Sequence, residues 1–147
     1  MSTCEEAELA REREVVERLL DRPWEELRFL EQFISLSESD LENDKTRRSA
    51  VERSLEVALQ CLLDASNRII ASRGWKSPES YVDIVRILGQ HGVLPREFAR
   101  GAEDMARLRN VLVHGYQHVD PAKLADHLRH LDDLRDFGGY LLDSMGV

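Results

Sequence analysis

The feature that most constrains the fold is the spacing of apolar residues, which recur every three or four positions along nearly the whole chain. This period places apolar side chains on one face of an α-helix. No segment alternates apolar and polar residues convincingly, as a half-buried strand would. The sequence therefore predicts an all-α fold, and the short connections between stripes favour an antiparallel up-and-down bundle of about five helices.

The size and composition indicate one domain. The chain has 147 residues, of which 42% are hydrophobic and 33% are charged. This length is typical of a single domain, and this composition excludes a low-complexity or disordered chain. The apolar runs are too short for a transmembrane helix, and the charged N-terminal segment does not look like a signal peptide. We expect a single domain over residues 1–147, located in the cytoplasm without membrane contact.

Proline, glycine and capping residues mark the expected helix ends. The apolar stripe of the first segment keeps its phase across Pro23, which predicts one helix kinked there. Residues 37–44 are predicted to connect this helix to a long second helix that runs to about residue 72 and ends at Gly74. The stripes of these two helices are Val16, Leu20, Leu27, Leu30 and Ile34, and then Val51, Leu55, Ala58, Leu62, Ala65 and Ile69.

Three further helices are expected after Gly74. Residues 77–79, Ser-Pro-Glu, are typical of a helix start, and Gly92 is expected to end that helix. Pro95 opens the fourth helix, and the pair at 120–121, Asp-Pro, opens a single fifth helix. The predicted inward residues are Tyr81, Ile84, Val85 and Leu88, then Phe98, Met105, Leu108 and Leu112, and then Leu124, Leu128, Leu131 and Leu142.

The overall charge limits what the protein can bind without specificity. The chain has 20 basic and 28 acidic residues, a net charge of −8. This balance argues against broad nucleic-acid binding, which depends on neutralising phosphates, although a local basic cleft is compatible with it. The two cysteines, Cys4 and Cys61, do not form a disulfide framework or a zinc knuckle.

The most informative stretch is residues 105–116, MARLRNVLVHGY, at the end of the fourth helix. On an ideal helix Arg109 lies about 140° from His114, so a straight helix keeps the two side chains apart. They converge only if the helix breaks near Gly115 or if a second chain places its own copy alongside. Asn110 is one turn from His114 and can contact it. The polar face that ends at His114 spans roughly 80° of arc and comprises Arg96, Arg100, Glu103, Arg107, Asn110 and His114.

Arginine and histidine together suit the cleavage of RNA without a metal. Histidine can take a proton from the ribose 2′-hydroxyl or give one to the leaving oxygen. Arginine stabilises negative charge on phosphoryl oxygens, and Tyr116 could stack on a base or contact a phosphate. From residue types alone, however, a polar helix face that ends in histidine is more typical of a solvated surface.

A family resemblance changes this balance. Residues 109–116, RNVLVHGY, match the R-x4-H-x-Y motif of HepT toxins, which belong to the HEPN superfamily. Residues 51–70 resemble the long second helix of that family, and the segments 77–81 and 92–95 resemble its third helix and the following turn. The resemblance therefore covers about residues 45–142.

The resemblance implies a ribonuclease toxin that acts as a homodimer through the motif helix, with Arg109 and His114 as catalytic residues and Asn110 in support. It also implies a partner, an MntA-like nucleotidyltransferase antitoxin, which transfers AMP to Tyr116. No cofactor and no metal are expected. Arg96, Arg100 and Arg107 share the face of His114, which makes them candidate RNA contacts.

Other interpretations remain open at this point. The spacing of His114 and His118 is that of zinc-binding helices, and His127 and His130 lie near two aspartates, Asp126 and Asp133; a solvated surface is the simpler interpretation of both clusters. Two further functions compete with the toxin: a non-catalytic HEPN partner that presents substrate to a separate nucleotidyltransferase, and a dimerising helical adaptor.

Overall fold

The computed structural model describes residues 2–114 and 119–146, and within these residues it contains seven helices and no strand. The prediction of an all-α fold is confirmed, with seven helices in place of about five. The helices are α1 (Thr3–Glu31), α2 (Glu38–Asn43), α3 (Lys45–Ser72), α4 (Tyr81–Gln90), α5 (Arg96–Val113), α6 (Pro121–Arg129) and α7 (Leu131–Ser144).

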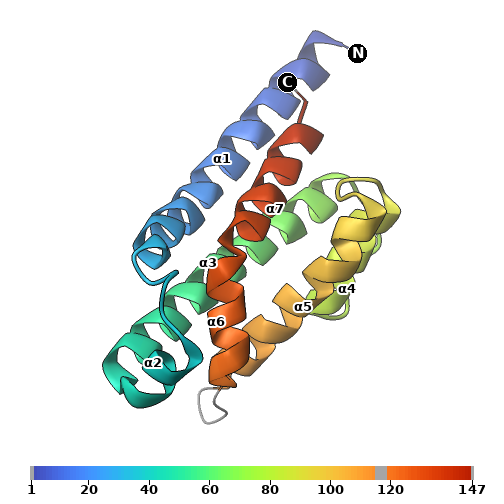
Figure 1. The fold of residues 1–147 in the computed structure, drawn as a ribbon. Coiled ribbons are helices and arrows are strands. Elements are labelled where there is room, and N and C mark those ends of the chain that lie inside the picture. The colour runs from blue at the N-terminus through green and yellow to red at the C-terminus, as the bar shows by residue number, and fades with distance from the viewer. Residues whose placement is uncertain (1, 115–118, 147) are drawn as a thin grey trace.

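Helix α3 lies at the centre of the arrangement. It packs against α1 and α7 on one side and against α4 and α5 on the other. Figure 1 shows α1 and α7 side by side, so that the two ends of the chain lie at the same end of the molecule. The short helix α2 packs on α6 at the opposite end. Because α3 contacts both helix pairs, it determines how α4 and α5 are placed relative to the rest.

The core is formed by the apolar stripes that the sequence predicts. All the stripe residues of α3 are buried, and so are Leu20, Leu27 and Leu30 of α1 and Phe137 of α7. Full burial of a leucine or phenylalanine side chain stabilises a fold by about 1.5–3 kcal/mol. The stripes thus both specify the helices and supply most of the energy that holds them together.

Helix α1 continues through Pro23, which confirms one helix in this segment. Pro23 is buried, so packing against the core compensates for the backbone hydrogen bond that proline cannot donate. The prediction that Ile34 extends the apolar stripe is wrong. Helix α1 ends at Glu31, and Ile34 lies in the following turn with 50% of its surface exposed.

The segment between α1 and α3 differs from the prediction. It was expected to be a connection, but residues 38–43 form α2. Ser37 caps this helix through a reciprocal pair of hydrogen bonds with Asp40, and Asp44 caps α3 by accepting from the backbone N–H of Arg47. The predicted connection thus contributes a cap at each of its two ends, although the structure between these caps is a helix.

The start of α4 lies later than predicted. The helix begins at Tyr81 rather than at residues 77–79. Ser80 is the capping residue, because its hydroxyl accepts from the backbone N–H of Asp83 at 3.0 Å, while the Asp83 carboxylate accepts from the backbone N–H of Glu79 at 2.9 Å. The predicted ends at Gly74 and Gly92 are confirmed, since both glycines have the positive φ of a helix terminus.

The prediction of a single continuous helix after residue 120 is wrong. The segment divides into α6 and α7 at His130, whose φ of −117° and ψ of 34° leave the α-helical region. The two parts have different packing partners, since α6 lies on α2 and α7 lies on α1 and α3, so the chain changes direction between them. The predicted inward residue Leu142 is only partly buried, whereas its neighbour Leu141 is fully buried.

Candidate functional site

Helix α5 carries the predicted motif, and its buried face sets the direction of the motif side chains. This helix packs against α3 and α4. The packing fixes its rotation about its own axis, so each remaining side chain points in a defined direction. The buried residues of α5 are Ala99, Ala102, Met105, Ala106, Leu108 and Leu112.

The Arg109 side chain is part-buried and held by three neighbouring groups. Its Nε donates a hydrogen bond to the Gln60 side-chain oxygen of α3 at 2.7 Å, and its Nη1 donates to the Asn110 side-chain oxygen at 3.0 Å. The guanidinium carbon lies 3.9 Å from the centre of the Tyr81 ring, the geometry of a cation–π contact. Arg109 thus lies where α3, α4 and α5 meet, in a defined orientation.

Gln60 is itself oriented by two further contacts. Its side-chain nitrogen donates to Asp64 at 2.8 Å and to the Tyr81 hydroxyl at 3.4 Å. These bonds turn the amide so that its oxygen faces Arg109. From the sequence, Tyr81 was expected only as an inward core residue, and Gln60 was not singled out. The spacing of Gln60 and Asp64 by one turn was a readable signal on α3, but no local pattern relates α3 to the register of α5.

His114 terminates α5 and is exposed. Its backbone φ of −74° and ψ of −6° are still helical, so the side chain leaves from the last turn of α5. Asn110, predicted to support His114, accepts a hydrogen bond from Arg109. Tyr116, the predicted modification site, lies outside the described residues. Of the predicted motif residues, the described contacts join Arg109 and Asn110.

The three arginines proposed as RNA contacts have different surroundings. Arg107 pairs with Asp104 at 3.0 Å and with Glu103 at 3.5 Å, and Glu103 is also paired with Arg86. Arg96 and Arg100 are exposed and line a shallow hollow between α4 and α5. The charge of Arg107 is therefore partly compensated by nearby carboxylates, while Arg96 and Arg100 stay available to an anionic ligand.

A wider hollow lies on the other flank of α5, against α6. It has a volume of about 720 Å³, and Leu108, Val111 and Val119 form its apolar part. His127 of α6 also lines it. Burial lowers the pKa of His127, although the carboxylates of Asp126 and Asp104 oppose this shift. The His127 imidazole is thus favoured in its neutral form.

The histidines of the alternative metal sites have no metal-binding arrangement among the described residues. His130 Nδ1 lies 2.8 Å from the Asp126 carbonyl oxygen and 3.4 Å from its carboxylate, an ordinary helix-end contact. Over residues 2–114 and 119–146, no three His, Cys, Asp or Glu side chains come close enough together to hold one metal ion. The second residue of the predicted pair His114 and His118 lies outside the described part of the chain.

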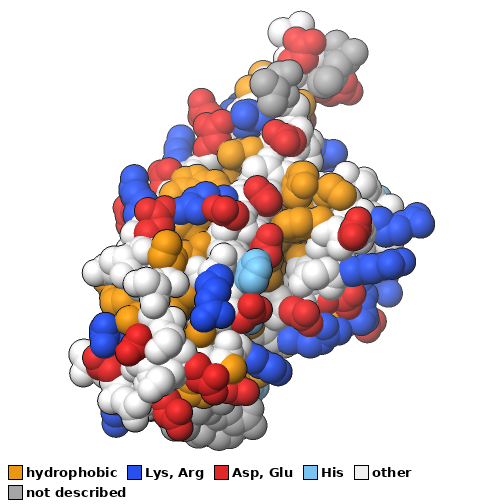
Figure 2. Space-filling model, in the orientation of Figure 1, with side chains coloured by type: hydrophobic (Ala, Val, Ile, Leu, Met, Phe, Trp, Pro, Cys, Tyr) orange, Lys and Arg blue, Asp and Glu red, His pale blue; other side chains and the backbone are white. Residues whose placement is uncertain are grey.

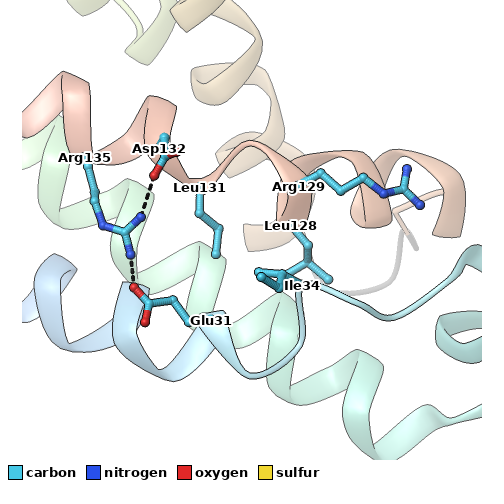
Figure 3. A pocket seen from close by; sticks show the side chains of 7 residues that line it. All are labelled: Glu31, Ile34, Leu128, Arg129, Leu131, Asp132 and Arg135. Carbon is cyan, nitrogen blue, oxygen red and sulfur yellow. Dashed lines mark hydrogen bonds and ion pairs between the residues drawn. The ribbon is translucent and has the colours of Figure 1, made fainter.

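A further hollow lies at the junction of α1, α6 and α7 (Figure 3). Ile34, Leu128 and Leu131 form its apolar part, and Arg135 crosses it to bind both Glu31 and Asp132. The ion pairs join three of the charged residues around this hollow, Glu31, Asp132 and Arg135, to one another. None of its lining residues belongs to the motif on α5, so it is a surface depression separate from the candidate site.

The wider surface is mixed in charge. Figure 2 shows acidic and basic side chains interspersed over the visible face, with apolar patches between them. Ion pairs between neighbouring turns, such as Arg13–Glu17 and Arg22–Glu26, account for part of this pattern. Any recognition of RNA must therefore depend on particular arginines rather than on the overall charge.

No helix among the described residues is long and apolar enough to cross a membrane.

Comparison with known protein families identifies the family to which this chain belongs. The profile of the HepT-like ribonucleases matches residues 23–140, which include Arg109, Asn110, His114 and Tyr116. This chain belongs to the HepT-like ribonuclease family. Its enzyme class is therefore ribonuclease, and the resemblance seen in the sequence is confirmed.

Two curated relatives carry nuclease names. The tRNA nuclease HepT of Aphanizomenon flos-aquae is 28% identical over 109 residues, which is 73% of this chain and 73% of the relative. The mRNA nuclease HepT of Shewanella oneidensis is 26% identical over 101 residues, which is 67% of this chain and 75% of the relative. These two relatives are named for different RNA substrates, so family membership alone does not specify the RNA.

A solved structure shows the same fold. It is the tri-AMPylated HEPN toxin of Shewanella oneidensis in complex with MNT antitoxin, which superimposes with a TM-score of 0.65 at 21% sequence identity. The match covers 90% of this chain and 94% of the other. The helical arrangement described above is therefore a HEPN-like fold.

Proposed function

We propose that the chain is the toxin of a toxin–antitoxin pair and cleaves RNA without a metal ion, with Arg109 and His114 as the catalytic residues. The observation that carries the proposal is the state of Arg109 in a HepT-like chain: its guanidinium is part-buried and oriented by Gln60, Asn110 and Tyr81 on the helix that ends at His114. An oriented guanidinium on the same helix as an imidazole, a common acid–base group, fits phosphoryl-transfer chemistry.

The proposed reaction needs only acid–base chemistry and charge stabilisation. An imidazole takes the proton of the ribose 2′-hydroxyl, and the 2′-oxygen attacks the adjacent phosphorus. The bond from phosphorus to the 5′-oxygen then breaks, and an imidazolium returns a proton to that oxygen. Arg109 donates hydrogen bonds to the phosphoryl oxygens while they gain negative charge. The products are a 2′,3′-cyclic phosphate and a 5′-hydroxyl.

In this proposal a homodimer brings together the Arg109 and His114 side chains, which a single α5 keeps apart. Arg109 and His114 point about 140° apart on one helix, so a straight α5 cannot direct both at the same phosphate. A two-fold pairing of motif helices places the Arg109 of one subunit beside the His114 of the other in a shared cleft. In this proposal Arg96 and Arg100, which are exposed, contact the RNA backbone beyond the cleaved linkage.

The reaction is tested with a 5′-labelled single-stranded RNA incubated with the protein in excess EDTA. We expect cleavage at the same rate as in buffer with Mg²⁺. The upstream products should carry cyclic phosphate ends, which block ligation until mild acid opens the ring and a phosphatase removes the resulting monophosphate. Cleavage that requires Mg²⁺, or products with a free 3′-hydroxyl, would contradict the mechanism.

Regulation is proposed to act on Tyr116. A nucleotidyltransferase antitoxin would transfer AMP from ATP to the tyrosyl oxygen and release pyrophosphate. Each transferred AMP adds bulk and negative charge beside the path of the RNA phosphates, which lowers RNA binding by steric block and repulsion.

This regulation predicts a specific modification. After incubation with the cognate nucleotidyltransferase and ATP, peptide mass spectrometry should find AMP on Tyr116, and the modified protein should lose RNA cleavage. Tyr116→Phe should remain unmodified and active, while the matched variant Tyr140→Phe should be modified like the parent. AMP found only on other residues would refute the assignment.

A further inference from the structure

The contacts of Arg109 go beyond what is needed to bury a side chain. Its guanidinium is held from three directions, by the face of the Tyr81 ring, by the Gln60 oxygen at Nε and by the Asn110 oxygen at Nη1. Among the described residues, its Nη2 makes no hydrogen bond. The three described contacts hold the guanidinium, and none of them uses the N–H groups at Nη2, which are donors of the kind that an anionic ligand needs.

The groups that hold Arg109 are themselves held. Tyr81 is the first residue of α4, whose start is fixed by the Ser80 cap. The Gln60 side-chain nitrogen donates to Asp64 and to the Tyr81 hydroxyl, so Gln60 presents its oxygen rather than its nitrogen to Arg109. The support of Arg109 thus comes from two helices that pack against α5, not from a loop.

We propose that Tyr81 and Gln60 are positioning residues for RNA cleavage, which set the plane of the Arg109 guanidinium before the substrate arrives. Arginine has a long, flexible side chain, and it stabilises a transition state best when its donors already point at the oxygens that gain charge. The Tyr81 ring fixes the plane by its cation–π contact, and Gln60 fixes the rotation within that plane through Nε. This inference rests on the function proposed above.

The first test compares steady-state cleavage of a single-stranded RNA by four variants. Tyr81→Leu and Gln60→Leu should lower kcat by about 10- to 100-fold with little change in KM, because the misplaced guanidinium weakens transition-state contacts more than ground-state binding. Tyr81→Phe should restore most of the rate, since the ring face makes the contact. The matched control is Tyr140→Leu, which loses a half-buried ring that packs on Phe98 and does not contact Arg109.

The second test separates positioning from general stability by chemical rescue. Arg109→Ala should be inactive, and free guanidinium ions at concentrations far below denaturing ones should restore part of its kcat. The rescue should be lost in Arg109→Ala/Tyr81→Leu and in Arg109→Ala/Gln60→Leu, because the vacated site no longer holds the ion. Circular dichroism at the assay temperature verifies that each variant is folded. If one of the two double variants is unfolded, the comparison is made with the other double variant.

The outcomes distinguish this inference from the function on which it rests. If Arg109→Ala keeps the parental rate, the catalytic role of Arg109 fails, and the positioning role fails with it. If Arg109→Ala is inactive while Tyr81→Leu and Gln60→Leu keep the parental kcat, the proposed function stands and the positioning role is refuted. Equal guanidinium rescue with and without the Tyr81 ring would refute it as well.

Discussion

Replacement of His114 by alanine is expected to lower the rate of RNA cleavage by about 100- to 10,000-fold. The variant loses the proposed acid–base imidazole, while Arg109 keeps its contacts to Gln60, Asn110 and Tyr81. The measurement is single-turnover cleavage of a labelled single-stranded RNA at saturating protein. In cells, expression of the parent chain should arrest growth, and expression of the variant should not.

His130→Ala is the matched control for this experiment. His130 is also an exposed histidine that terminates a helix, in this case α6, and it is not part of the motif. Its replacement should leave the cleavage rate close to that of the parent. If His114→Ala keeps the parental activity, His114 is not a catalytic residue. That result would favour the alternative function, in which the chain is a non-catalytic HEPN partner of a nucleotidyltransferase.

The two adjacent glycines of α7 are expected to respond in opposite directions to alanine. A Cβ atom at Gly138 would lie 2.3 Å from the Trp24 side chain of α1, so the two helices must separate or the indole must move. Overpacking of this kind costs about 1–3 kcal/mol. At Gly139 a Cβ atom meets nothing within 4 Å, and replacing a helical glycine by alanine stabilises a helix by about 0.5–1 kcal/mol.

Urea unfolding monitored by circular dichroism measures both effects on the free energy of unfolding. Gly138→Ala should lower it, and Gly139→Ala should raise it. The tryptophan emission of folded Gly138→Ala should also shift, because the environment of Trp24 changes. Equal effects of the two substitutions would show that α1 and α7 do not approach closely at Gly138.

Residues that act through their own helix could be predicted from the sequence. The stripe of α3 is buried as expected, and the ends at Gly74 and Gly92 follow from a backbone conformation that glycine adopts readily. The RNVLVHGY motif could also be recognised, since it is a contiguous string. Each of these features depends on neighbours within a few residues, which a sequence displays directly.

Features that depend on distant neighbours were missed. The break at His130 arises because α6 and α7 pack on different helices, and the apolar spacing keeps its phase across the break. Helix α2 is too short for periodicity to be visible, and only Leu41 in it is buried. Ile34 has helical spacing to the α1 stripe, but the helix ends before it.

Periodicity and local motifs were enough to predict the all-helical class, the helix ends at Gly74 and Gly92, and the string that links the chain to the HepT-like ribonucleases. The support of Arg109 depends on helix packing, because Gln60 and Tyr81 lie on two other helices and reach it only when α3, α4 and α5 pack in one register. The physical reason is that a periodic pattern states which face of a helix is buried. It does not state which residue of another helix will lie against that face.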